Sequence, residues 1–525
     1  MPAPQNSSGP TPHAARWPWE ALTGIASAAV VLAVAEVISL VAGAAGSPLF
    51  AVGSLVIDLA PGGVKELVVG LFGTGDKAAL LTLMAVILVL LAAAGGVLET
   101  RRPPWGVVLF GLASLFALVA VVTRAGASGL NGVPTIVGAV AGIVVLRIST
   151  ERLRRWRAVR SEDAPRAGQL ERRSFLSLTL IAGVAALAAG TGARIVNAAA
   201  SAVTDLRTRL TLPKAAVVAP PVPAGASLDV AGLSPLVTPN ADFYRIDTAL
   251  QVPSVDPDTW RLKITGMVEN ELELSFAELL DKPLIEHMAT LACVSNDVGG
   301  DLIGNALWLG YPIRELLAKA VPKAGADMVL STSVDGFTAG TPLDVLQDEG
   351  TQALLAVGMN GQPLPLEHGF PVRMVVPGLY GYVSATKWLV SLEVTRFSRA
   401  EGYWIPRGWS ANGPIKLSSR IDTPRSNASV ARGTVAVAGV AWAQHIGVQA
   451  VEVQVDDEPW VQAELADSVS ADTWRQWLYR WESSAGSHSI RVRATDANGK
   501  TQSKHYVPPA PNGSEGWHEV TVTVG

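Results

Sequence analysis

Long apolar runs fill most of the first 200 residues, and they constrain the fold more than any other feature of the sequence. Each of five runs is about long enough to cross a bilayer. Four precede an arginine-rich stretch and one follows it: Thr23–Gly46, Ala78–Leu98, Trp105–Thr123, Leu130–Ile148 and Ser174–Ala198. We therefore predict a membrane domain with about five transmembrane helices over residues 1–200.

The composition requires a soluble part beside the membrane domain. Charged residues make up 16% of the chain and hydrophobic residues 49%, with a mean hydropathy of +0.32. These values are too apolar for an ordinary soluble protein and too charged for a bundle of spans alone. The 41 basic and 45 acidic residues give a net charge of −4, so no overall basic field indicates nucleic acid.

Arginines between residues 147 and 173 predict the orientation in the membrane. Nine arginines against four acidic residues place this loop in the cytoplasm. The N-terminus is then cytoplasmic if Leu55–Phe72, with its Pro61-Gly62-Gly63 and its charges, is interfacial or re-entrant. If Leu55–Phe72 crosses, the N-terminus lies outside. The last span runs outward in both cases, so we expect everything after residue 200 on the extracytoplasmic face of the cytoplasmic membrane.

The hexapeptide Glu171–Leu176 stands directly before the last apolar run and looks like a twin-arginine signal, which addresses proteins that are exported folded. Ordinary positive-inside arginines are the alternative. No histidine or cysteine lies in a predicted span, so we predict no haem in the membrane domain. Glu36 is an intramembrane carboxylate, which indicates either proton or quinone handling or a protonated, helix-paired side chain.

After residue 200 the sequence changes character three times. Residues 201–235 are rich in Ala, Pro and Val and predict a semi-rigid linker. Within residues 236–420, β-like runs alternate with a helical stretch, which predicts an α+β domain. Residues 421–525 contain β-rich runs and an Asn498-Gly499 hairpin signal, which predict a β-sandwich of about 100 residues.

Cys293 is the single cysteine, so an intrachain disulfide, a Cys-rich zinc site and a thiolate-ligated iron–sulfur cluster are excluded. It stands where the β-like run Glu286–Ala292 gives way to the loop Val294–Gly300. A lone cysteine can be a buried small hydrophobe. As a thiolate it would suit a soft or high-valent metal.

A second cluster, Asn360–Arg373, carries glycines and prolines around one histidine and one arginine, and Lys387 follows it. Arg and Lys on turns are well suited to holding a phosphate. A Pro/Gly-rich surface loop with solvated charges is the alternative.

Together, these stretches resemble the molybdopterin domain of the sulfite oxidase family, which includes bacterial methionine-sulfoxide reductase catalytic subunits. The resemblance rests on Asn240–Tyr244, the Cys293 loop with Gly304–Gly310, Asn360-Gly361 with His368 and Arg373, Pro377-Gly378, and Lys387-Trp388. The tail is similar to the family's immunoglobulin-like dimerisation domain at Gly439–Trp442, Trp474–Trp477 and Arg493–Asp496. The match covers roughly residues 236–525, and the predicted spans resemble those of membrane-bound actinobacterial members.

The resemblance implies a molybdenum–molybdopterin cofactor, to which Cys293 supplies the thiolate. It also implies that the pterin and its phosphate are held by Asn240, Tyr244, Arg245, Ser333, His368, Arg373, Ala385, Thr386 and Lys387, with Arg245 a further catalytic candidate. The implied reaction is oxygen-atom transfer on a small S- or N-containing substrate. Electrons would pass to or from a separate cytochrome, quinone or membrane haem subunit, and the tail could form a homodimer.

The sequence departs from sulfite oxidases at two places. Asp297-Val298 stands where they carry an arginine pair, and Tyr382–Thr386 contains no arginine. Sulfite is therefore weakly supported, and a neutral S-oxide or N-oxide or another small oxyanion is equally open. A protein or methionine sulfoxide reductase subunit is one alternative. A membrane-anchored binding or assembly protein without activity is another. A molybdopterin protein would be loaded in the cytoplasm, which favours the twin-arginine interpretation.

Overall fold

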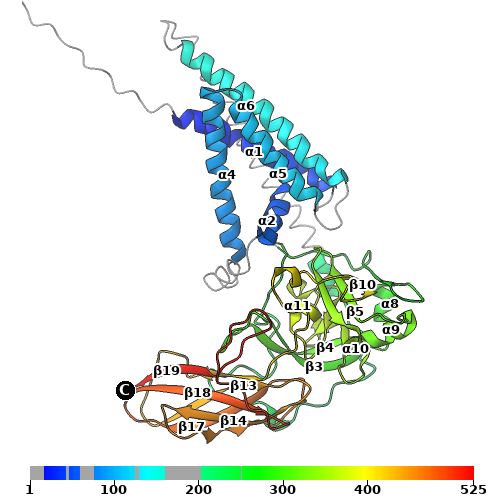
Figure 1. Cartoon of the computed structure of the whole chain (residues 1–525), viewed down its shortest axis with the longest axis vertical. Helices are drawn as coiled ribbons and strands as arrows, with labels where there is room; N and C mark the ends of the chain where they lie inside the picture. Colours follow the sequence, from blue (N-terminus) through cyan, green and yellow to red (C-terminus); the bar gives the residue numbers. More distant parts are fainter. Residues whose placement is uncertain (1–16, 43–46, 60–75, 124–128, 160–202, 250) are drawn as a thin grey trace, which may run out of the picture. The chain divides into compact units, whose positions relative to one another are not determined.

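The computed structural model describes residues 17–42, 47–59, 76–123, 129–159, 203–249 and 251–525. The chain divides into two compact units, one within residues 1–201 and one that holds residues 202–525 (Figure 1).

The first unit is helical. Its described helices are α1 (Trp17–Ala42), α2 (Pro48–Leu59), α4 (Asp76–Arg101), α5 (Trp105–Val122) and α6 (Val133–Val159), with a 3-10 turn at Gly129–Gly132. Four of them are long and apolar enough to cross a membrane, within Pro18–Ser39, Ala78–Arg101, Trp105–Val122 and Leu130–Trp156. These segments overlap the first four predicted spans. The fifth predicted span, the twin-arginine-like hexapeptide and most of Leu55–Phe72 lie outside the described residues.

Small residues let the helices of the first unit approach closely. A Cβ atom at Gly24 or Gly96 would collide with backbone atoms of the facing helix, α4 or α1 respectively. Glu20 on α1 receives a hydrogen bond from Arg101 Nε on α4 at 2.8 Å. Glu36 Oε1 accepts a hydrogen bond from Ser47 Oγ at 2.7 Å, so this intramembrane candidate has a polar partner.

The second unit begins with an α+β domain built on two sheets. One sheet has the order β2-β1-β10-β5-β6, and the other has the order β3-β4-β7-β8 with β9 paired to β7. The strands are β1 (Arg261–Gly266), β2 (Leu272–Ser275), β3 (Ile285–Ala292), β4 (Ile303–Pro312), β5 (Met328–Ser333), β6 (Thr338–Pro342), β7 (Leu354–Met359), β8 (Gln362–Pro363), β9 (Arg373–Val375) and β10 (Leu389–Thr395). The helices are α8 (Phe276–Leu280), α9 (Ile313–Ala320), α10 (Leu343–Gln347) and α11 (Gly381–Ser384).

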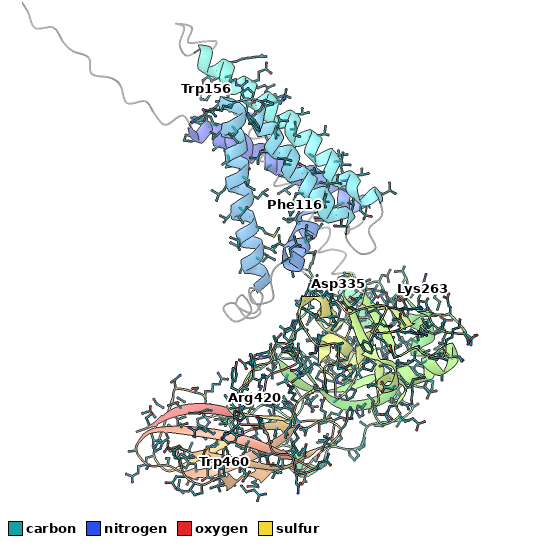
Figure 2. All side chains as sticks on the ribbon, viewed as in Figure 1. Phe116, Trp156, Lys263, Asp335, Arg420 and Trp460 are labelled. Carbon is teal, nitrogen blue, oxygen red and sulfur yellow. The ribbon has the colours of Figure 1, made fainter. Side chains whose placement is uncertain are left out.

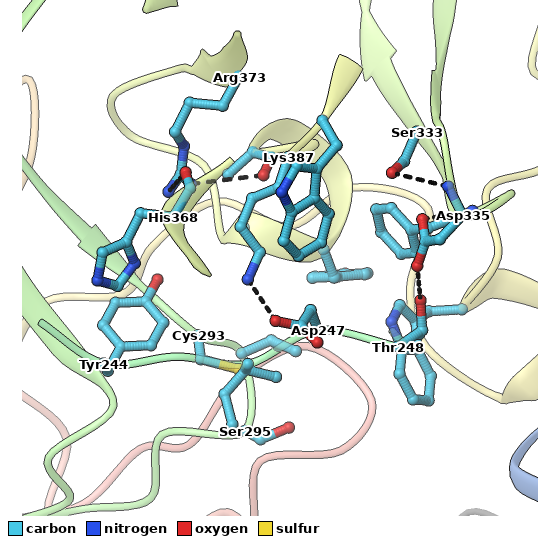
Figure 3. A pocket seen from close by; sticks show the side chains of 18 of the residues that line it. Tyr244, Asp247, Thr248, Cys293, Ser295, Ser333, Asp335, His368, Arg373 and Lys387 are labelled. Atoms are coloured by element: carbon cyan, nitrogen blue, oxygen red, sulfur yellow. Dashed lines mark hydrogen bonds and ion pairs between the residues drawn. The ribbon is translucent and has the colours of Figure 1, made fainter. Parts of the chain in front are cut away.

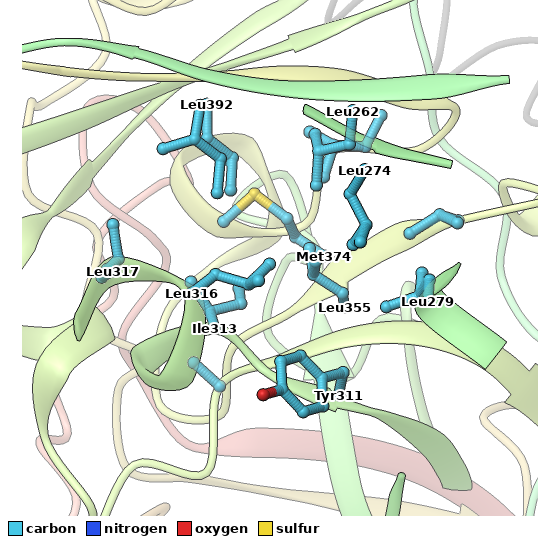
Figure 4. Close-up of a cluster of buried hydrophobic side chains, with 14 of the residues drawn as sticks. Leu262, Leu274, Leu279, Tyr311, Ile313, Leu316, Leu317, Leu355, Met374 and Leu392 are labelled. Carbon is cyan, nitrogen blue, oxygen red and sulfur yellow. The ribbon is translucent and has the colours of Figure 1, made fainter. Parts of the chain in front are cut away.

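A large apolar core packs between elements of both sheets (Figure 4). It contains Leu262, Leu274, Leu279, Tyr311, Ile313, Leu316, Leu317, Leu355, Met374 and Leu392. Helix α9 buries Ile313, Leu316, Leu317 and Ala320, the spacing of one helical face. Strand β7 is buried at all six positions, as expected for a continuous apolar run inside a sheet.

The remainder of the second unit is a β-sandwich, which confirms the predicted all-β tail. One sheet has the order β11-β13-β17-β16 and the other β12-β19-β18-β14-β15. The strands are β11 (Ser418–Thr423), β12 (Ala428–Val430), β13 (Thr434–Trp442), β14 (Val448–Val455), β15 (Val461–Gln462), β16 (Glu464–Leu465), β17 (Arg475–Glu482), β18 (Gly486–Asp496) and β19 (His518–Val524). Both sheets contribute to a core around Val437, Trp477, Ile490 and Val522.

Buried polar contacts tie the sandwich to the α+β domain. Arg420, labelled in Figure 2, donates to the Gly300 carbonyl at 2.7 Å, to Ser234 at 2.9 Å and to Asp422 at 2.6 Å. The segment 203–235 also packs on this unit: Arg207 donates to the carbonyl of Leu364 at 2.7 Å, and Ala226 is fully buried.

Candidate cofactor site

Cys293 is the first residue after β3, at the mouth of the β3–β4 hairpin. Its backbone N–H donates to Leu302 O at 2.9 Å, and its carbonyl accepts from Asn296 N at 3.1 Å, so the hairpin loop fixes its position. The Asn296 side chain closes the loop by accepting from Leu302 N at 2.8 Å. Burial raises the pKa of the Cys293 thiol, while hydrogen bonds from the backbone and side chain of Ser295 lower it. These donors would support a thiolate.

Cys293 opens into a pocket of about 870 Å³, its open mouth included. In the close-up, Arg373 and His368 lie on one side of Lys387, and Ser333 and Asp335 lie on the other (Figure 3).

Two buried cations line the pocket. Arg373, at the start of β9, exposes 5% of its surface and donates to the carbonyls of His368 and Ala385 at 3.2 and 3.4 Å. Lys387 Nζ donates to Asp247 Oδ2 at 2.6 Å and to Glu367 O at 3.1 Å. Burial lowers the pKa of Arg373 to about 10 and that of Lys387 to about 8. Within the described residues Arg373 forms no ion pair with a carboxylate, so an anionic ligand could supply its counter-charge.

His368 lies beside these cations and is almost fully buried. Its Nε2 lies 3.0 Å from the carbonyl oxygen of Asn240, and its ring packs edge-on against Phe243. Burial and then the charge of Arg373 lower the pKa of His368 to about 4. The neutral imidazole therefore donates from Nε2 and keeps Nδ1 as an acceptor.

Tight backbone turns bring the two cations together. Gly369 has a φ of +108°, and a Cβ there would lie 3.0 Å from Arg373 Cβ and 3.1 Å from Lys387 Cα. Only glycine fits this conformation and this approach without strain. Trp388 also has a positive φ, of 50°, and its Nε1 donates to Leu366 O at 2.8 Å.

Polar and aromatic side chains also line the pocket. Thr248 donates to Asp335 Oδ2 at 3.2 Å, in the turn that follows Ser333. Aromatic rings from Phe337, Tyr382, Trp388, Trp404 and Trp409 line the pocket. Three of them pack on one another: the Tyr382 and Trp409 ring centroids are 5.8 Å apart, and those of Trp404 and Trp409 are 6.3 Å apart.

Most of the residues singled out from the sequence meet in this pocket. Its lining includes Tyr244, Cys293, Ser333, His368, Arg373, Ala385 and Lys387. Three others stand behind the lining: Asn240 contacts His368, Arg245 Nε donates to Asp247 at 2.9 Å, and Thr386 contacts Ser331 at 2.7 Å.

The sequence reasoning missed Asp247, Thr248 and Asp335, and it did not assign a role to the aromatic wall. Asp247 carries a readable signal, because it is an acid two residues after Arg245 in an otherwise uncharged run from Phe243 to Pro253. The aromatic residues lie between positions 337 and 409 without a regular period, so spacing alone could not group them.

The departures from the sulfite oxidase pattern also have structural counterparts. Asp297 turns toward the sandwich, where its Oδ2 accepts a hydrogen bond from Tyr506 at 3.0 Å. It is not part of the pocket lining, and neither is Arg245.

Comparison with known proteins identifies the family. Residues 249–404 match the oxidoreductase molybdopterin-binding domain, and residues 418–492 match a bacterial Ig domain. YuiH, an oxidoreductase of Bacillus subtilis, is 34% identical over 158 residues, which cover 30% of this chain and 76% of YuiH. The chain belongs to the sulfite oxidase family of molybdopterin-dependent oxidoreductases.

Other relatives include the mitochondrial sulfite oxidase of Homo sapiens, which is 30% identical over 342 residues covering 55% of this chain and 62% of the human protein. The chain thus spans less than two thirds of that relative's length. A solved structure of the sulfane dehydrogenase SoxCD from Paracoccus pantotrophus aligns with 55% of this chain and 81% of its own, at 20% identity and a TM-score of 0.47.

Family membership implies molybdenum–molybdopterin as the cofactor, and the donors in the pocket fit it chemically. A soft thiol, Cys293, suits a high-valent metal. Arg373 and Lys387 suit an anionic phosphate, and buried neutral His368 suits hydrogen bonding to a heterocycle. Within the described residues no cluster of three or more His, Cys, Asp or Glu side chains could hold a metal ion alone. Cys293 would therefore need ligands that the cofactor itself brings.

Proposed function

We propose that this chain is a membrane-anchored molybdenum–molybdopterin oxidoreductase that transfers an oxygen atom to or from a small S- or N-containing substrate. The observation that carries the proposal is that the single thiol, Cys293, opens into the same pocket as the buried cations Arg373 and Lys387. The bound cofactor supplies the two-electron oxygen-atom chemistry.

In this proposal the protein's own residues bind and orient. Cys293 provides a thiolate ligand, and Lys387 and Arg373 neutralise the phosphate of the pterin. His368 stays neutral and offers a hydrogen-bonding edge, while Asn240 fixes its ring through the 3.0 Å contact. The aromatic wall excludes water from the substrate end. We keep Tyr244, Ser333, Ala385 and Thr386 as proposed cofactor contacts and Arg245 as a proposed catalytic residue.

Molybdenum analysis of the purified full chain tests the cofactor. We expect near-stoichiometric molybdenum and the fluorescence of oxidised pterin in the wild type, and an altered metal environment without turnover in Cys293→Ser. Lys387→Met should lower both the molybdenum content and the pterin content. Lys263→Met is the matched control, because Lys263 is 61% exposed and lies on β1. Absence of molybdenum and pterin after expression in a host that makes and inserts the cofactor would refute the proposal and favour the non-catalytic binding or assembly protein.

A second candidate function, reduction of neutral sulfoxides such as those of methionine, is favoured by the charge of the pocket. Its lining holds two acids, Asp247 and Asp335, and two cations, Arg373 and Lys387. Addition of an anionic cofactor to this charge-balanced lining would make the pocket net negative, which would disfavour an inorganic anion such as sulfite. The aromatic wall suits an apolar organic substituent.

A substrate comparison separates the two candidates. With a sulfoxide substrate, kcat/KM should exceed that with sulfite, and Trp409→Ala should lower it by roughly tenfold while molybdenum content stays unchanged. Trp460→Ala, in the sandwich, is the control. Faster turnover of sulfite than of any neutral sulfoxide would overturn the second candidate and leave the first.

We further propose that the catalytic part lies on the extracytoplasmic face. Four apolar helices support membrane association. The proposed division is a membrane domain at 1–200, a linker at 201–235, a cofactor domain at 236–420 and an immunoglobulin-like domain at 421–525 that could pair two chains. Protease added to intact spheroplasts should cleave a C-terminal tag if this orientation holds. A tag that is cleaved only after lysis would place it in the cytoplasm.

A further inference from the structure

Three ionisable side chains meet outside the pocket, where the sandwich contacts the α+β domain. Asp472, between β16 and β17, accepts from His287 Nε2 on β3 and from His445 Nδ1 after β13, each at 2.9 Å. Only 10% of the Asp472 side chain is exposed. Burial raises the pKa of Asp472, but the hydrogen bonds from His287 and His445 together outweigh burial and lower the pKa from 3.8 to about 2. Asp472 is therefore a carboxylate that accepts from both histidines.

His445 has a second acceptor. Its Nε2 lies 3.1 Å from the carbonyl oxygen of Pro377. Neither the Asp472 carboxylate nor this carbonyl can donate, so both ring nitrogens of His445 have to be donors. Only the charged imidazolium form has two N–H groups. The two contacts thus require a protonated His445.

Gln444 holds the same peptide group from its other end. Its Oε1 accepts from Gly378 N at 2.7 Å, and its Nε2 donates to the carbonyls of Thr290 and Asp472. Adjacent side chains of one sandwich loop therefore bind both the C=O and the N–H of the Pro377–Gly378 peptide. Gly378 has a φ of +82°, and a Cβ there would collide with the His445 ring. Glycine is required where this ring approaches.

The contacts of this loop reach two walls of the pocket. The Pro377–Gly378 peptide begins the segment that supplies Gly381, Tyr382, Ala385 and Lys387 to the lining. Thr290 lies on β3, three residues before Cys293. We propose that charged His445, together with Gln444 and Asp472, is a positioning residue that holds the 377–388 wall against β3, and that deprotonation of His445 loosens this wall.

The surrounding charges set the direction of the pH dependence. The hydrogen bond to Asp472 raises the pKa of His445, and burial opposes it. The charge of Asp348, the residue after α10, also favours the charged form of His445. His287 contacts Oδ2 of Asp472, and His445 contacts Oδ1. A raised pKa in the folded chain means that the contribution of His445 is fully present below its ordinary value of 6.5 and is lost as the pH rises through the raised value.

Hydrogen exchange on the full chain in detergent, prepared without cofactor, tests this assignment. What the pocket binds rests on the proposed function, but this measurement needs neither cofactor nor turnover. After correction for intrinsic exchange, protection of residues 377–388 in the wild type should fall between pH 6 and pH 9, with a midpoint above 6.5. In His445→Gln the protection should be roughly tenfold lower at pH 6, which corresponds to about 1.4 kcal/mol. The fall in protection with rising pH should be absent, so that the only remaining change is the rise expected from Lys387, whose pKa burial lowers to about 8.

Two further variants separate positioning from simple damage. Asp472→Asn keeps the shape of the side chain but removes its charge, so the midpoint should move to lower pH. His505→Gln, at an exposed histidine of the same sandwich, should behave like the wild type. The rate of alkylation of Cys293, the single thiol, gives a second measure of how tightly the wall is held. His445→Gln should react faster than the wild type at pH 6. The two rates should become equal at high pH, where His445 of the wild type is neutral.

A wild-type protection that is flat from pH 6 to pH 9 would overturn the assignment, and so would an unchanged midpoint in Asp472→Asn. If His445→Gln fails to fold, the wild-type profile and Asp472→Asn still decide. Failure of molybdenum loading with an intact pH profile would count against the proposed function and not against this inference.

Discussion

Replacement of Lys387 by methionine removes an ammonium group from the pocket and keeps most of the apolar length of the side chain. Lys387 Nζ lies 2.6 Å from Asp247 Oδ2, and 10% of the Lys387 side chain is exposed. Loss of one partner of such a buried pair ordinarily destabilises a protein by about 3–5 kcal/mol. The environment of this lysine gives a different expectation.

Burial outweighs the attraction of Asp247 and lowers the pKa of Lys387 from 10.5 to about 8. At about 1.36 kcal/mol for each pH unit, this lowering means that charged Lys387 destabilises the cofactor-free folded chain by roughly 3 kcal/mol at pH 7. The substitution removes that penalty. It also removes one donor to Asp247, at a cost of about 1–3 kcal/mol.

Arg245 limits the second effect, because its Nε remains 2.9 Å from Asp247 Oδ2. The two contributions leave a net stabilisation of the cofactor-free chain by between about 0 and 2 kcal/mol at pH 7. Molybdenum content should nevertheless fall sharply, because the phosphate loses a cation. The variant thus separates stability from cofactor binding.

Pulse proteolysis of the full chain in urea measures this free energy of unfolding, scored on the fragment that contains residues 203–525. The penalty from Lys387 is present below pH 8 and disappears as the pH approaches 10.5. The advantage of Lys387→Met over the wild type should therefore vanish or reverse by pH 10. Lys263→Met should change stability by no more than about 0.5 kcal/mol. A loss of 3 kcal/mol or more at pH 7, unchanged at pH 10, would falsify the reasoning.

Three other outcomes follow from the same geometry. Gly369→Ala and Gly361→Ala both place a side chain at a positive φ, so each should lower the free energy of unfolding by about 1–2 kcal/mol. Only Gly369 faces Arg373 and Lys387, so only Gly369→Ala should also lower the molybdenum content. Burial lowers the pKa of both His368 and His518 to about 4, so urea unfolding midpoints should fall as the pH drops from 6.5 toward 4, and His518→Gln should remove part of this acid sensitivity. Arg420→Met should destabilise the chain by about 3 kcal/mol or more, measured by urea unfolding, because it leaves buried Asp422 without its 2.6 Å partner; Arg480→Met, at a pair more than half exposed, should change stability by less than about 1 kcal/mol.

Sequence patterns predicted the parts of the fold that depend on local periodicity. The first four apolar runs correspond to four helices long enough to span a membrane, and the alternation in β19 is visible as residues that are buried at every second position. Helix α9 is likewise readable from the spacing of its four buried residues. These features follow from the period of helices and strands, so no tertiary information is needed to find them.

The candidate site was only partly readable, for physical reasons that its residues illustrate. Cys293 and Arg373 stand out because their residue types are rare or carry charge within a shaped loop. Thr386 stands between two residues of the pocket lining, Ala385 and Lys387, yet its hydroxyl contacts Ser331 behind the pocket. The backbone after α11 is irregular, so residue order alone does not predict which side chains face the pocket. Asp247 acquires its role from a lysine 140 residues away in sequence, and such a partner is set by packing alone.

The charges of the pocket also connect folding to the proposed export of a loaded protein. Arg373 and Lys387 both have lowered pKa values because burial disfavours their charged forms, so the empty pocket is a source of instability. A ligand that binds only the folded state stabilises it by RT ln(1 + [L]/Kd), about 4 kcal/mol at a thousandfold excess over Kd. Neutralisation of these two cations by an anionic cofactor would be one contribution to a low Kd. The loaded chain is therefore expected to be markedly more stable than the empty one, which is the property that a route for folded cargo requires.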